Sequence, residues 1–230
     1  YYDRDEGPVG GLRKPPAVTP ALLGFSLGIQ LIGLALSVVV SWRLVLLYMI
    51  VMLLSVAYSH PRFRWKARPL LSLLVVGFGQ GAIGFWAGWL CAARAPLPLF
   101  GSATGLLGMA AAVLLTTGFY PLSQLYQIDE DRQRGDLTFA VTYGPRASFR
   151  FALACLVTGG LCIALVALQR FGARDAALAL GAQLILWCVV WRWHHQFRSE
   201  VMANFVTLHR LQLAVSAGTL GYVSLRLLLK

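Results

Sequence analysis

Charged residues are scarce in this sequence, acidic ones most of all. Of its 230 residues 13% are charged, with nine Asp and Glu against twenty Lys and Arg. Together with 58% hydrophobic residues and a mean hydropathy of +0.67, this excludes an ordinary soluble domain and is typical of a polytopic membrane protein. The basic residues lie in short stretches between apolar runs. That pattern indicates membrane-surface loops, anionic membrane lipid or an anionic substrate, and argues against a nucleic-acid partner.

Cysteine is almost as scarce, and its placement excludes the familiar metal and redox motifs. The four cysteines lie in apolar segments, with no CxxC pair and no Cys/His spacing for zinc. We therefore expect them to be small buried hydrophobic residues. The sequence also lacks Walker A, HExxH and GxSxG patterns, so nothing predicts a P-loop, a zinc protease or a serine hydrolase.

Long apolar segments dominate what is present. A polar segment rich in Gly and Pro covers residues 1–17. Seven candidate spanning helices follow it, at about 18–41, 44–59, 69–93, 103–128, 147–169, 175–193 and 203–228. This pattern predicts an all-α fold, a polytopic membrane helix bundle.

The distribution of Lys and Arg predicts the orientation of this bundle. Thirteen of the twenty lie on the face that carries the N-terminal loop, and six lie on the opposite face. By the positive-inside rule, the first face is cytoplasmic, and a bacterial inner membrane is expected. Seven spans place the C-terminus on the other side.

Seven of the nine acidic residues fall in two clusters. The first acidic cluster is Asp3, Asp5 and Glu6; the second is Asp129, Glu130, Asp131 and Asp136. Both are predicted on the cytoplasmic face, beside the basic loop at 59–69. Acids at helix ends are often only solvated loop charge, but two clusters on one face favour a shared site.

Three polar residues near the second cluster are spaced as on one helical face. Gln124, Gln127 and Asp131 follow at i, i+3 and i+7. Amide and carboxylate oxygens suit Mg²⁺, which usually takes one or two carboxylates and completes its shell with water and phosphate. Two such clusters could hold a diphosphate bridged by metal, with Arg64, Lys66 and neighbouring arginines neutralising the remaining charge.

Three stretches, in order, resemble motifs of the UbiA superfamily of intramembrane prenyltransferases. The first is YYDRDEG at 1–7, where Asp3 takes the place of the second Asp of an Asn-Asp-x-x-Asp motif. The second, YSHPRFRWK at 58–66, resembles a Tyr-Ser-x-Pro segment with downstream basic residues. The third, QIDEDRQRGDLTFAVTYG at 127–144, resembles the second aspartate motif and its Asp-Arg-x-x-Gly-x-x-Thr tail. Gln127 departs from the family, which usually has Asp there.

This resemblance implies a nine-helix bundle around a central cavity. About seven of those helices are in this chain, and residues 1–230 form a single domain lacking its first helices. It also implies Mg²⁺-dependent transfer of an isoprenoid group from a prenyl diphosphate donor to a lipophilic or aromatic acceptor, such as a quinone precursor.

The site roles that follow are these. The predicted catalytic residues are Asp3, Asp131 and Lys66. The predicted metal ligands are Asp3, Gln127 and Asp131. The predicted substrate-binding residues are Tyr58, Arg64, Lys66, Gln124, Tyr126 and Arg132.

Three other interpretations remain open. A transporter of an anionic substrate would usually carry ionisable groups nearer the middle of its spans. An alcohol phosphotransferase would need an Asp-Gly-x-x-Ala-Arg signature, which is missing. A family member with impaired activity is kept open by Gln127.

Overall fold

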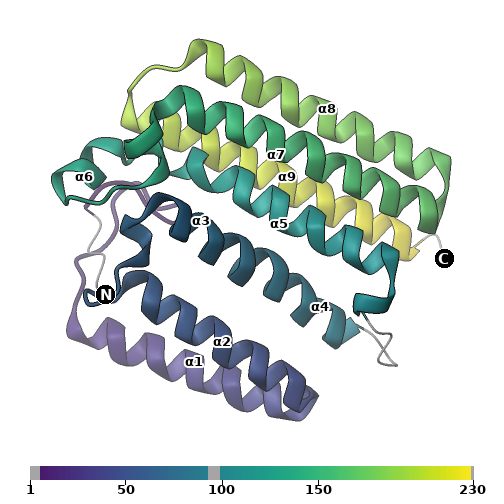
Figure 1. Ribbon diagram of the computed structural model, residues 1–230, viewed down its shortest axis with the longest axis horizontal. Helices are drawn as coiled ribbons and strands as arrows, with labels where there is room; N and C mark the ends of the chain where they lie inside the picture. The colour runs from purple at the N-terminus through teal and green to yellow at the C-terminus, as the bar shows by residue number, and fades with distance from the viewer. Residues whose placement is uncertain (1–5, 93–98, 229–230) are drawn as a thin grey trace.

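The structure is a computed structural model that describes residues 6–92 and 99–228, and it is all-α within those ranges (Figure 1). Its α-helices are α1 (Pro20–Val40), α2 (Trp42–Ser59), α3 (Pro69–Val76), α4 (Gly84–Ala92), α5 (Ala103–Ser123), α6 (Ile128–Gln133), α7 (Phe139–Phe171), α8 (Ala173–Gln196) and α9 (Val201–Leu228). A π-helix, η2 (Gly77–Ile83), joins α3 to α4, and 3₁₀ turns form at η1 (Trp65–Ala67) and η3 (Leu99–Gly101).

Seven helices in the described residues are long and apolar enough to cross a membrane, which confirms the predicted number. Five of them have bounds within about three residues of those expected. The fourth ends at Ser123 rather than near residue 128, just after an internal Pro121. The fifth begins at Phe139 rather than 147, because α7 continues through a kink at Gly144 whose φ is 79°.

The spans alternate in direction, and their ends define two faces of the bundle (Figure 1). α6 and the start of α7 lie at the same end as the start of α1. The last span, α9, finishes at the opposite end, as an odd number of crossings requires. In this view α5, α7, α8 and α9 form one group and α1 and α2 a separate hairpin, with α3 and α4 between them.

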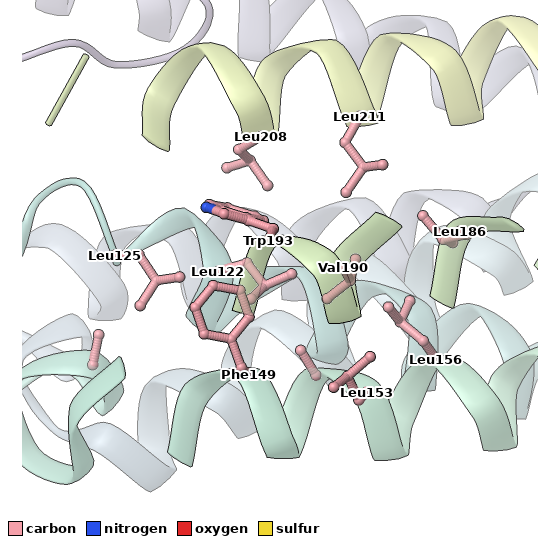
Figure 2. Packing of buried hydrophobic residues seen from close by; sticks show 12 residues of the cluster. Leu122, Leu125, Phe149, Leu153, Leu156, Leu186, Val190, Trp193, Leu208 and Leu211 are labelled. Carbon is pink, nitrogen blue, oxygen red and sulfur yellow. The ribbon is translucent and has the colours of Figure 1, made fainter. Parts of the chain in front are cut away.

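The best-buried hydrophobic side chains belong to the α5–α7–α8–α9 group. Figure 2 shows Leu122 from α5, Phe149 and Leu156 from α7, and Val190 from α8 converging; all four are fully buried. Close approach of α5 and α7 depends on glycine, because a Cβ on Gly118 would lie 2.9 Å from the Cβ of Cys155. Small residues give helices in lipid the tight packing that the hydrophobic effect cannot supply there.

The glycine-rich third span serves both packing and a cavity. Gly77 and Gly81 are buried against α5, and a Cβ on Gly81 would lie 2.7 Å from the Cα of Val113. Gln80, between them, is exposed to a cavity instead. π-Helical turns such as η2 are frequent at functional sites, because they rotate side chains relative to an α-helix.

The cysteines only partly match the expectation of burial. Cys155 is buried and Cys162 is partly buried, but Cys91 and Cys188 are exposed. Both exposed residues lie on spanning helices, whose apolar outer surfaces can face lipid without cost.

Candidate functional site

The second acidic cluster lies at the end of the bundle, on the connection between α5 and α7. α5 ends at Ser123, a turn carries Gln124 to Gln127, and α6 begins at Ile128. The continuous helix assumed for the i, i+3, i+7 spacing is therefore absent, and the three polar residues do not share one face. Gln127, the residue that caps the start of α6, and Asp131 remain one turn apart, with the Asp131 amide donating to the Gln127 carbonyl at 2.8 Å.

Gln124 turns inward instead. It is 4% exposed, and its Oε1 accepts a hydrogen bond from the Ala140 amide at 3.1 Å. Amides in the first turn of a helix have no partner within the helix, so this side chain satisfies one at the start of α7. The geometry thus gives Gln124, which was predicted to bind substrate, a structural contact.

Asp136 organises the basic residues of the predicted site. It is 1% exposed and accepts two hydrogen bonds from Arg64, Nε to Oδ1 at 2.7 Å and Nη2 to Oδ2 at 3.0 Å. Lys66 Nζ lies 3.5 Å from Oδ2. Two-pronged guanidinium–carboxylate pairs of this kind fix orientation as well as charge.

The backbone joins the same two segments. The Leu137 amide donates to the Ala67 carbonyl at 3.1 Å. Arg64 and Lys66, predicted to act beside the second acidic cluster, are thus brought there by the α2–α3 connection. Sequence reasoning gave Asp136 no separate role, and no spacing rule links it to residues some seventy positions away.

Asp131 is held from the start of α7. Its Oδ2 accepts a hydrogen bond from the Thr138 hydroxyl at 3.0 Å, and its carbonyl accepts from the Asp136 amide at 2.8 Å. The intervening turn contains Gly135 at φ 74°, a left-handed conformation that glycine adopts readily. In the Asp-Arg-x-x-Gly-x-x-Thr pattern, the Asp therefore lies on α6, the Gly forms the turn, and the Thr donates the hydrogen bond that holds the Asp, referred to below as the clamp on Asp131.

Glu6, the one described residue of the first acidic cluster, contacts the second cluster. The Glu6 amide donates to Glu130 Oε1 at 2.9 Å, and Arg134 donates to the same oxygen at 2.6 Å. The approach is so close that a Cβ on Gly7 would lie 2.6 Å from Glu130 Oε2. Asp3, the predicted ligand from the first cluster, lies outside the described residues.

Arg132 has a more exposed position than its predicted role suggests. It pairs with Asp129 at 3.2 Å, and the two side chains are 63% and 71% exposed. Ion pairs this exposed contribute little to stability. Arg132 remains accessible to a ligand outside α6, and its substrate role stays a prediction.

Two adjoining cavities lie next to the end of α5, and their lining residues come chiefly from α3–η2, α5 and α9. One, of about 400 Å³, is lined by residues that include Gln80 and Tyr120, and the other, of about 430 Å³, by residues that include Tyr126 and His209. They share Ser123, Gln212 and Ser216, so they adjoin, and the two together are referred to below as the central cavity.

Both predicted tyrosines are near this space. The Tyr58 hydroxyl lies 2.8 Å from that of Tyr120, which lines the cavity. Tyr126 packs edge-on against Phe205, with ring centres 5.4 Å apart, and lines the cavity directly. Tyr120 was missed as a site residue, although it opens the polar stretch that contains the second cluster.

A Mg²⁺ ion fits the donor chemistry of the cluster, but the described residues alone do not form a cage. Among them, no group of three His, Cys, Asp or Glu is placed to hold a metal. Mg²⁺ needs only one or two carboxylates when water and phosphate complete its shell. Asp131, held at the end of α6, can provide one of them.

Comparison with known proteins places these features in a family. A stretch of 124 residues is 33% identical to a lycopene elongase/hydratase of Haloferax volcanii, covering 54% of this chain and 38% of that protein. No solved structure matches the chain. The model of the UbiA prenyltransferase family matches residues 16–212, which include all seven spans at least in part, α6 and the clamp on Asp131. The chain therefore belongs to the UbiA prenyltransferase family.

Proposed function

We propose that this protein transfers an isoprenoid group from a prenyl diphosphate to a lipophilic acceptor within the membrane, with Mg²⁺ as cofactor. The observation that carries the proposal is that the acidic residues of α6 and the cations Arg64 and Lys66, joined through Asp136, lie at one end of the bundle, next to a cavity lined by Ser123 and Tyr126 of the same connection. A prenyl diphosphate needs this arrangement, with charged residues for its diphosphate and an adjoining cavity for its isoprenoid tail.

The reaction breaks the bond between the allylic carbon and diphosphate oxygen, and forms a carbon–carbon bond to the acceptor, which then loses a proton. Negative charge grows on the departing diphosphate, so fixed cations near it lower the barrier. Mg²⁺, held by Asp131 together with Gln127 and Asp3, would neutralise part of that charge.

Arg64 and Lys66 are suited to the same task. Asp136 engages two of the five guanidinium donors of Arg64, whose side chain remains 33% exposed. Both cations are thus fixed before substrate arrives, and they need not reorganise as charge develops. Tyr120 and Tyr126 line the central cavity and Tyr58 contacts Tyr120, so their rings are suited to stabilise the allylic cation.

The acceptor is proposed as an apolar molecule that reaches the central cavity from the lipid. An aromatic quinone precursor fits the family resemblance. The name of the Haloferax volcanii relative specifies lycopene, which favours a polyene as a second candidate. The bias of Lys and Arg supports a cytoplasmic location for α6, in a bacterial inner membrane.

The proposal is tested with the full-length protein in nanodiscs, supplied with radiolabelled prenyl diphosphate and each acceptor class. Prenylated product and released diphosphate are measured with Mg²⁺ and with EDTA. Asp131→Asn should lower turnover by at least about a hundredfold, the usual scale for losing a group that stabilises transition-state charge.

Asp129→Asn is the matched control, because it removes one carboxylate from the exposed side of the same helix. It should leave turnover within about twofold, as expected for a solvated charge. Equal losses in both variants would refute the site assignment. Movement of an anion across liposomes without chemical change would favour transport, and Mg²⁺-dependent donor binding without turnover would indicate an impaired family member.

A further inference from the structure

A second polar concavity lies at the same end of the bundle as α6, but between α7, α8 and the start of α9. It consists of two adjoining cavities, of about 520 Å³ and 780 Å³, which share His195 and Phe197. We call it the interfacial pocket. None of its lining residues belongs to the candidate active site, and the proposed prenyl transfer does not use it.

The charge of the interfacial pocket is strongly biased. Arg146, Arg192 and Arg198 line it, and Glu200 is the one acidic residue among the lining residues. Within residues 6–92 and 99–228, none of these three arginines forms an ion pair, whereas Arg64, Arg134 and Arg226 each have an acidic partner. Such a pocket favours an anion with several acceptor oxygens.

The backbone of α7 adds to this bias. The helix is interrupted at Gly144, with φ 79° and ψ 170°, and resumes at Pro145, a residue favoured at the first helical position. Gly144, Pro145 and Arg146 all line the pocket. The long segment from Pro145 to Phe171 therefore directs the partial positive charge of its N-terminus toward the pocket.

His194 adds a polar group to the pocket. Its Nδ1 is buried and has no hydrogen-bond partner among the described residues. The ring is held in place by the fully buried Phe149, with ring centres 5.0 Å apart. A buried polar nitrogen is costly to leave unpaired, so Nδ1–H donating to a ligand oxygen would be stabilising.

The floor of the pocket is rigid. Phe149 also contacts Trp193 and Phe197 edge-on. Trp193 donates to Asn204 Oδ1 at 3.0 Å, and Asn204 donates to the Arg198 carbonyl at 2.7 Å, which ties the α8–α9 connection to α8. The arginines are thus mounted on a preformed concave surface. Arginines that served only to set the membrane topology would not need a preformed concave surface.

We infer that the interfacial pocket binds the phosphate of an anionic phospholipid. The apolar surface beside it decides between a lipid and free phosphate. Leu184, Ile185 and Val189 are exposed on α8, and Val189 itself lines the pocket. A phosphate at the arginines would therefore place acyl chains along the outer face of α8, within the bilayer.

The test counts lipids retained by the full-length protein in native mass spectrometry, after release from nanodiscs of phosphatidylcholine doped with phosphatidylglycerol. The wild type is expected to retain phosphatidylglycerol selectively. The double variant Arg146→Gln/Arg192→Gln should lose this selectivity by about tenfold, and His194→Phe, which keeps a ring but removes Nδ1, by about threefold.

The matched control is Arg170→Gln/Arg174→Gln, which removes two exposed arginines at the opposite end of the same two helices. It should retain phosphatidylglycerol as the wild type does. An equal loss in the control would overturn the inference, because net charge would then explain binding. Retention of both lipids alike, with binding of inorganic phosphate alone, would overturn the assignment to a lipid.

Discussion

Replacing Asp136 with Asn should loosen the whole polar end of the bundle. The substitution keeps the shape of the side chain but removes the charge that holds Arg64 and Lys66. Breaking a buried pair costs about 3–5 kcal/mol when the remaining charge has no other partner. Because Arg64 is 33% exposed and water can solvate it, we expect a smaller loss of about 2–3 kcal/mol.

Thermal unfolding of the purified protein in detergent measures this loss. For a chain of this length, about 2–3 kcal/mol corresponds to a fall in Tm of roughly 5–10 °C. The KM for prenyl diphosphate should rise as well, because the two cations lose their fixed positions. Asp129→Asn, which breaks an exposed pair, should lower Tm by about 1 °C or less.

A double-mutant cycle isolates the interaction itself. Asp136→Asn combined with Arg64→Gln should be less destabilising than the sum of the single changes, since both remove the same contact. If Asp136→Asn left Tm and KM unchanged, Asp136 would not be what positions these cations. The reasoning from its burial and two-pronged contact would then be refuted.

Three further changes probe packing and local contacts. Gly81→Ala should destabilise the protein by about 1–3 kcal/mol, because its Cβ would meet the Val113 backbone. Gly88→Ala should be neutral or slightly stabilising, because nothing lies within 4 Å of its Cβ. Chemical denaturation of the two variants compares their free energies of unfolding. Gln124→Ala should cost about 1–2 kcal/mol by leaving the Ala140 amide unpaired, and hydrogen exchange at that amide should accelerate. Tyr120→Phe should cost about 1 kcal/mol, because it removes the hydroxyl that lies 2.8 Å from that of Tyr58, and thermal unfolding of the variant measures this loss.

The spans and their order were predictable because length and hydropathy alone decide whether a helix can cross a bilayer. Alternating topology also placed Arg64 and Lys66 at the same face as the second acidic cluster, and the structure brings them together there. These predictions depend only on the number of spans and on the charges of the loops between them, both of which can be read from the sequence.

The details of the site required the fold. The spacing of Gln124, Gln127 and Asp131 assumed an unbroken helix, but α5 stops at Ser123 and Gln124 turns toward Ala140. Pro121, inside the last turn of α5, was the available sign of an ending. The partnership of Asp136 with Arg64 depends on two loops meeting in space, and no local pattern encodes that.

The paired loops also join the two sides of the bundle. Asp136 with Arg64, and the bond from Leu137 to Ala67, fasten the α1–α4 side of the bundle to the α5–α9 side at one end. The π-helix η2 joins the two sides again, because its Gly81 lies against the Val113 backbone of α5 and leaves little space between the two helices. The charged residues of the site therefore rest on an interface between two helix groups that is closed by polar contacts at its end and by apolar contacts along its length.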